Sequence, residues 1–115
     1  MLNHAKNTTV EVAAFELKKN GETRYYILPW NDNDRTTSRF TTNLNKYGLD
    51  GYNEINIMQL YHTHPGSNMP GPTDREWSNN SLIPIWAICP NGKSYIYSPI
   101  ENTTNAIELK NFLNF

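Results

Sequence analysis

A pair of histidines separated by one residue, with a proline directly after it, most constrains how this chain can fold. His62 and His64 follow segment 56–61, which is rich in apolar and aromatic residues. Side chains at positions i and i+2 of a strand point to the same face, so both imidazoles can meet at one point. Pro65 ends the strand, because proline has no N–H to donate to a neighbouring strand. The sequence therefore predicts a strand that ends in two co-directed imidazoles.

A loop and the start of a helix follow the histidines. Residues 66–72 contain two Gly and two Pro, which favours a loop. The next stretch, with Thr73 and Glu76 three residues apart, is typical of a helix start, and a capping box alone would explain both residues. Together with the histidines, a carboxylate here would give three zinc ligands and leave a fourth position open. Asp74 is the alternative to Glu76 if the loop is threaded differently.

This arrangement resembles the JAB/MPN/JAMM metalloprotease family, whose pattern is an early Glu, His-Ser/Thr-His-Pro, a loop and Ser-x-x-Asp. Residues 62–65, His-Thr-His-Pro, match the pattern. Thr73-x-x-Glu76 stands where the family has Ser-x-x-Asp, after a slightly longer loop. The resemblance implies that the two histidines and an acidic residue, Glu76 or else Asp74, bind Zn²⁺. It also implies that the early Glu activates water and that the Thr73 hydroxyl supports the tetrahedral intermediate.

A β-hairpin near the N-terminus carries the candidates for the early Glu. Segments 10–17 and 23–30 are β-prone and flank an Asn-Gly pair, a strong signal for a hairpin turn. In the family the catalytic Glu begins such a strand and small residues follow it, which favours Glu11. Glu16 is the competitor. The two are five residues apart and face opposite sides of a regular strand, so only one can face the histidines. A solvated strand carboxylate is the simpler interpretation of either.

The second half of the chain predicts further strands and short helices. The apolar run 82–89 predicts a strand, and a turn at 90–93 leads to a returning strand at 94–98. Apolar residues at helical spacing predict one helix over about 38–47 and another over 105–113. The helix that follows Thr73 is expected to end near residues 79–81.

These elements predict an α+β fold in a single domain, residues 1–115. The resemblance implies a JAMM-like (cytidine-deaminase-like) mixed β-sheet with two hairpins, flanked by two or three short helices. Cys89, the one cysteine, excludes an internal disulfide and is predicted to be a buried small apolar residue. The third histidine, His4, stands outside any motif and is predicted to be exposed.

Charge and hydropathy exclude several classes of partner. The formal net charge is −1 and the pI is about 6.3, so a basic surface that binds nucleic acid is not expected. No run approaches the roughly 20 apolar residues of a transmembrane helix, and the N-terminus has no signal peptide. We therefore expect no membrane partner. Location stays open between the cytoplasm and delivery as a secreted effector domain, and the chain is compatible with a piece cut from a longer protein.

The short, polar, Asn-rich sequence looks most like the JAB-like domains at the C-termini of bacterial polymorphic toxins. The resemblance implies a zinc metallopeptidase that hydrolyses a peptide or isopeptide bond in a protein substrate, with ubiquitin-like proteins and a cognate immunity protein as candidate partners. The alternative is a JAMM-fold protein-binding module that has lost catalysis. The Ser-to-Thr and Asp-to-Glu departures favour it, and the intact histidines oppose it. A nucleic-acid enzyme with a histidine-based metal site is weaker still, because no basic groove is predicted.

Overall fold

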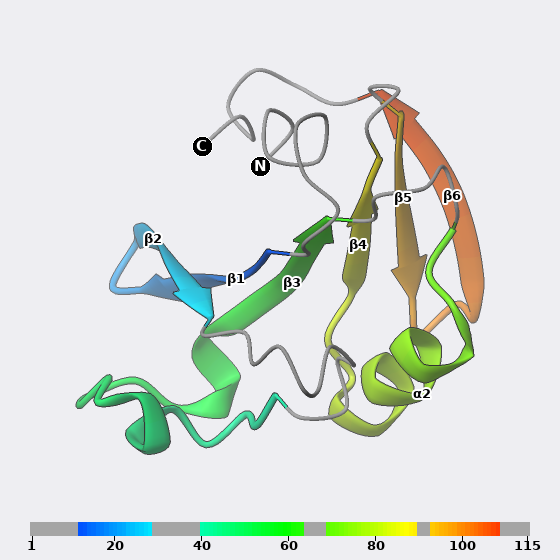
Figure 1. The fold of residues 1–115 in the computed structure, drawn as a ribbon. Helices are drawn as coiled ribbons and strands as arrows, with labels where there is room; N and C mark the ends of the chain where they lie inside the picture. The colour runs from blue at the N-terminus through cyan, green and yellow to red at the C-terminus, as the bar shows by residue number, and fades with distance from the viewer. Residues whose placement is uncertain (1–11, 29–39, 64–68, 90–92, 109–115) are drawn as a thin grey trace.

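The computed structural model describes residues 12–28, 40–63, 69–89 and 93–108. Within them the chain forms a six-stranded sheet of order β2-β1-β3-β4-β5-β6 (Figure 1). Its strands are β1 (Ala13–Lys19), β2 (Glu22–Leu28), β3 (Ile57–Thr63), β4 (Ile85–Ile88), β5 (Lys93–Ser98) and β6 (Thr103–Glu108). The helices are α2 (Pro72–Ser81) and two 3₁₀ turns, η2 (Leu44–Tyr47) and η3 (Glu54–Asn56). The α+β class predicted from the sequence is thereby confirmed.

Helix α2 connects the two parallel strands of an otherwise antiparallel sheet. Strand β3 pairs with β4 in parallel, with His62 opposite Ala87, and every other strand pair is antiparallel. A parallel pair needs a crossover connection, and α2 provides it. The helix lies beside β4 and β5 (Figure 1). The end of β3 and the start of α2 therefore belong to one β–loop–α unit.

Both predicted hairpins are present. In the turn between β1 and β2, Asn20 has φ 54° and Gly21 has φ 80°. Positive φ at both central residues is the geometry of the type I′ turn, which Asn-Gly favours and which matches the twist of the flanking strands. Strands β4 and β5 form the second antiparallel pair. Residues 90–92 of its turn lie outside the described residues.

The helix predicted over residues 105–113 is wrong for the part that the structure describes. Residues Thr103–Glu108 form strand β6, which pairs with β5 and places Asn105 opposite Ile96. The helical spacing came mostly from apolar residues after position 108, which lie outside the described residues. The described segment starts with two β-branched residues, Thr103 and Thr104, which favour a strand. Its pairing with β5 then determines its conformation.

The helix predicted over about 38–47 is shorter than expected. Within the described part of this segment, 40–47, only Leu44–Tyr47 is helical, as the 3₁₀ turn η2, and Gly48 ends it with φ 73° as predicted. The backbone before η2 is used in other bonds. The carbonyl of Phe40 accepts the indole N–H of Trp77 at 3.0 Å, and the N–H of Thr41 donates to the Tyr47 hydroxyl at 3.2 Å. These contacts hold the segment in a non-helical conformation.

The main hydrophobic core lies between the sheet and α2, and His62 shares that face of the sheet. Leu60, two residues before His62, belongs to this core, as does Ala13, which pairs with His62 across β1 and β3. Tyr61 points to the other face, where it forms a smaller cluster. The main core contains Ala13, Phe15, Leu17, Leu28, Phe40, Leu44, Leu49, Ile57, Leu60, Trp77, Ile83, Ile85 and Tyr97. His62 is thus a polar residue at the margin of an apolar layer, under the helix.

Candidate metal centre

His62 lies near the C-terminal end of β3, with only 1% of its surface exposed. Its cross-strand neighbours are alanines on both sides, Ala13 on β1 and Ala87 on β4. Their small side chains leave space above the sheet for the imidazole. A histidine in the middle of a sheet between two alanines can therefore project toward α2 rather than lie flat against a bulky neighbour.

Asp74, in the first turn of α2, is the acidic residue that meets His62. Its Oδ2 atom lies 3.1 Å from Nε2 of His62 and also accepts the backbone N–H of Gly71 at 3.0 Å. Asp74 is 9% exposed. Gly71 is the residue before the helix, and Pro72 occupies its first position. The carboxylate thus caps the helix, where its charge is favourable, and faces the imidazole.

The distance between these two side chains fits two corners of a zinc site. Ligand atoms about 2.0–2.1 Å from a tetrahedral Zn²⁺ are roughly 3.3 Å apart, close to the 3.1 Å between Nε2 of His62 and Oδ2 of Asp74. A ring nitrogen and a carboxylate oxygen are also ligand atoms that zinc accepts. Among the described residues no third His, Cys, Asp or Glu joins this pair. His64, the predicted second imidazole, lies outside the described residues.

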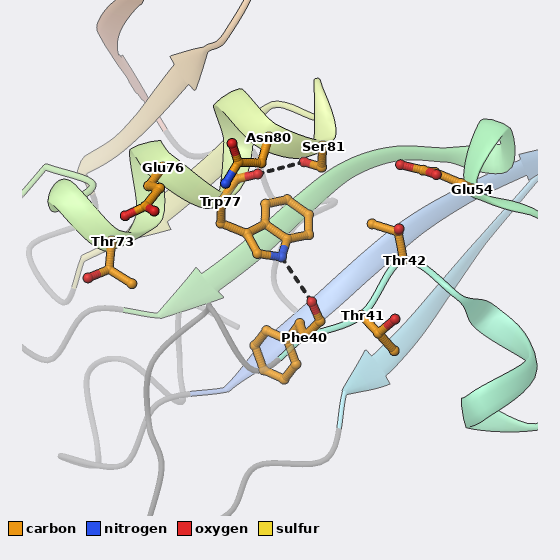
Figure 2. A pocket seen from close by; sticks show the side chains of 9 residues that line it. All are labelled: Phe40, Thr41, Thr42, Glu54, Thr73, Glu76, Trp77, Asn80 and Ser81. Carbon is orange, nitrogen blue, oxygen red and sulfur yellow. Dashed lines mark hydrogen bonds between the residues drawn. The ribbon is translucent and has the colours of Figure 1, made fainter.

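Glu76 and Thr73 lie on another side of α2 from Asp74. Both are exposed and line a pocket next to the helix, shown in Figure 2. Residues two apart on an α-helix are separated by about 200° around its axis, so Asp74 and Glu76 cannot both face the sheet. Of the two acidic alternatives left open by the sequence, the structure brings Asp74 into contact with His62.

The position of Gly71 was not recognised from the sequence. When the family's Ser-x-x-Asp pattern is aligned on Asp74, Gly71 stands where the family has Ser, so no side-chain hydroxyl occupies that position. The capping pair at the helix start is likewise Gly71 and Asp74 rather than Thr73 and Glu76. Pro72 was the available signal. Proline favours the first helical position, which makes the residue before it the N-cap and Asp74 the third residue of the helix.

Thr63, between the two histidines, fastens the start of β1 to the end of β3. Its hydroxyl accepts the N–H of Val12 at 2.8 Å, and its own N–H donates to the Val12 carbonyl at 2.9 Å. Thr63 is fully buried. Glu11, the favoured catalytic Glu, directly precedes Val12 in the sequence and lies outside the described residues. These hydrogen bonds therefore hold Val12, the residue after Glu11, against Thr63, the residue after His62.

Glu16, the competing catalytic Glu, is on the opposite face of the sheet from His62. Its carboxylate accepts hydrogen bonds from the hydroxyls of Tyr25 at 3.1 Å and Tyr61 at 3.3 Å, and from the amide of Gln59 at 3.2 Å. Burial, followed by the nearby Glu16 charge, raises the pKa of both tyrosines. Glu16 thus belongs to a hydrogen-bonded cluster that does not contact His62.

The remaining predictions have mixed outcomes. Cys89 is fully buried, as expected for a small apolar residue. In the part of the chain that the structure describes, no helix has the length and apolar character needed to cross a membrane. His4 lies outside the described residues.

Comparison of the sequence with models of known protein families and with curated proteins finds no match.

Proposed function

We propose that the chain is a zinc-dependent metallopeptidase of the JAB/MPN/JAMM type, with His62, His64 and Asp74 as its zinc ligands. One observation carries the proposal. The histidine predicted from the His-x-His-Pro motif is buried, and its Nε2 atom lies 3.1 Å from a buried carboxylate at the start of the next helix. His62 of the motif thus contacts an acidic residue from the segment where the family pattern has one.

The protein supplies the ligands and the groups that move protons. Bound zinc would act as a Lewis acid that polarises the scissile carbonyl and makes water more acidic. Glu11 takes a proton from the attacking water and delivers it to the leaving amine. The support for Glu11 in this role is the register of β1 against β3. Val12 is held against Thr63, and Ala13 lies opposite His62 on the same face. Thr73, the oxyanion donor expected from the sequence, lines a pocket on another side of α2 from Asp74 and is therefore left out of this proposal.

The substrate we propose is a peptide or isopeptide bond in a protein, and the fold a JAMM-like sheet of an effector or toxin domain. The support is the resemblance at residues 62–65, together with the β3–α2–β4 unit that brings the start of a helix to the histidine strand. Ubiquitin-like substrates and a cognate immunity protein belong to the same proposal.

A catalytically inactive binding module on the same scaffold is the second candidate. The observation that favours it is Gly71, which places no hydroxyl at the Ser position when the family pattern is aligned on Asp74. Loss of one oxyanion donor typically lowers turnover by about 100- to 1,000-fold. Such a protein would keep the buried His62–Asp74 pair and bind a protein partner without cutting it.

A peptidase assay separates these two functions. The zinc-loaded protein would be incubated with a library of peptides derived from a whole proteome, and new termini identified by mass spectrometry. We expect hydrolysis that a zinc chelator abolishes and that added Zn²⁺ restores, because the ligands are protein side chains that bind the metal reversibly. Hydrolysis that persists in excess chelator would contradict zinc catalysis. A zinc-loaded protein that cuts no peptide would support the binding module.

A further inference from the structure

A pocket of about 380 Å³ lies between α2, the segment 40–42 and the start of η3 (Figure 2). We call it the Glu54–Glu76 pocket, after the two carboxylates in its wall. Its volume is in the range of small-ligand sites and is ample for one long side chain. The lining residues are Phe40, Thr41, Thr42, Glu54, Thr73, Glu76, Trp77, Asn80 and Ser81. Among the described residues of the lining, two are acids and none is a base.

The two carboxylates come from different elements and are not neutralised within the described structure. Glu54 begins η3 and Glu76 lies in the first half of α2, and both residues are exposed. Among the described residues, the one ion pair joins His62 and Asp74. No hydrogen bond joins the side chain of Glu54 or Glu76 to another described residue. Both carboxylates line the pocket, and within the described part of the chain neither is paired with a cation.

Trp77 supplies a fixed aromatic wall between the two acids. Figure 2 shows its ring in the middle of the pocket, with Glu76 toward one end and Glu54 toward the other. Its indole N–H donates to the Phe40 carbonyl at 3.0 Å, and its ring stacks on Phe15 with a centroid distance of 6.2 Å. An aromatic ring held in place next to carboxylates attracts cations, both through its electron-rich face and through the negative charges.

The pocket is rigidly linked to the candidate metal centre. Thr73 and Glu76 in its wall and Asp74 beside His62 belong to the first turns of the same helix. The pocket and the candidate metal centre therefore share helix α2.

We propose that the Glu54–Glu76 pocket binds a lysine or arginine side chain of the polypeptide substrate and makes the peptidase selective for sequences with a basic residue close to the cleaved bond. This inference rests on the proposed function for its substrate and on the pocket's own residues for its charge preference. The hydroxyls of Thr42 and Thr73 and the amide oxygen of Asn80, which also line the pocket, supply acceptors for the remaining N–H groups of a guanidinium.

The charge preference can be tested without zinc and without hydrolysis. The probes are Nα-acetyl-arginine amide and Nα-acetyl-citrulline amide, which have nearly the same shape but differ in charge. Binding would be followed by NMR at the indole N–H of Trp77. We expect the arginine probe to bind at least about fivefold more tightly than the citrulline probe. Either Glu76→Gln or Glu54→Gln should lower the affinity for the arginine probe by about three- to tenfold.

Glu22→Gln is the matched control, because Glu22 is exposed on β2 and lies outside the pocket lining. It should leave arginine binding unchanged. Equal binding of the two probes would overturn the proposal. Arginine binding that is insensitive to both Glu76→Gln and Glu54→Gln would do the same.

A cleavage profile links the pocket to the substrate. In the peptide library, the zinc-loaded wild type should favour sites with Lys or Arg near the cleaved bond, and Glu76→Gln should lose about three- to tenfold of that preference. Zinc-dependent cleavage with no basic preference would overturn the pocket proposal and leave the proposed function intact. Charge-selective probe binding without cleavage of any peptide would refute the proposed function and leave the pocket's preference for a cation standing.

Discussion

Replacing Asp74 with asparagine is expected to weaken zinc binding by at least about 100-fold. Loss of a group that only hydrogen-bonds to a metal ligand already lowers metal affinity by roughly 10- to 100-fold, and Asp74 is proposed to bind the metal itself. The substitution removes the negative charge that lies 3.1 Å from Nε2 of His62. It retains a side-chain oxygen that can accept the Gly71 N–H, so the helix cap can survive. The measurement is a competition titration of Zn²⁺ against a chromogenic chelator, with circular dichroism to confirm folding.

Glu76→Gln is the matched control for this prediction. It makes the same change of acid to amide two residues later on α2, on the exposed side that lines the pocket. We expect its zinc affinity to equal that of the wild type. If Glu76→Gln weakened zinc binding and Asp74→Asn did not, the third ligand would be Glu76, and the contact between His62 and Asp74 would be a hydrogen bond of purely structural value.

Replacing Glu11 with glutamine is expected to lower turnover by about 100- to 10,000-fold while zinc remains bound. The glutamine amide cannot accept a proton from water at neutral pH, but it has nearly the same size as the carboxylate. Turnover on a peptide from the library would be measured at saturating Zn²⁺, and bound metal would be measured on the same preparation.

Glu16→Gln is the comparison variant for the general base. Glu16 accepts hydrogen bonds from Tyr25, Tyr61 and Gln59 on the face of the sheet away from His62. Its substitution is expected to lower the melting temperature rather than the turnover of the folded protein. Loss of turnover in Glu16→Gln with normal activity in Glu11→Gln would reverse the assignment. Loss of zinc in Glu11→Gln would make Glu11 a ligand instead of a base.

Local sequence signals identified the parts of the fold that short-range chemistry determines. The Asn-Gly turn at residues 20–21 adopts the positive φ angles that this pair favours. The His62 strand is recognisable from its apolar residues and from the proline that follows the motif. Residues 105–108 were predicted to be helical but form part of β6, because this strand depends on pairing with β5, which the helical spacing of apolar residues does not reveal.

The candidate site shows a similar limit. The sequence named His62 and both acidic alternatives, but it ranked Glu76 ahead of Asp74 because Thr-x-x-Glu looked more like Ser-x-x-Asp. The helix start decides which acid faces the sheet, and Pro72 sets that start. The Glu54–Glu76 pocket could not be predicted from the sequence. Its walls come from the segment around Phe40, from η3 and from α2, which only the folded chain brings together.

The most direct test of a zinc centre is the metal content of the purified protein, measured by elemental analysis for the wild type and for the double variant His62→Ala/His64→Ala. We expect about one zinc per wild-type chain and none in the variant, because removing two of three ligands destroys the site. A wild type without zinc, even after the metal is added back, would contradict the proposed centre and direct the search to protein partners of a binding module.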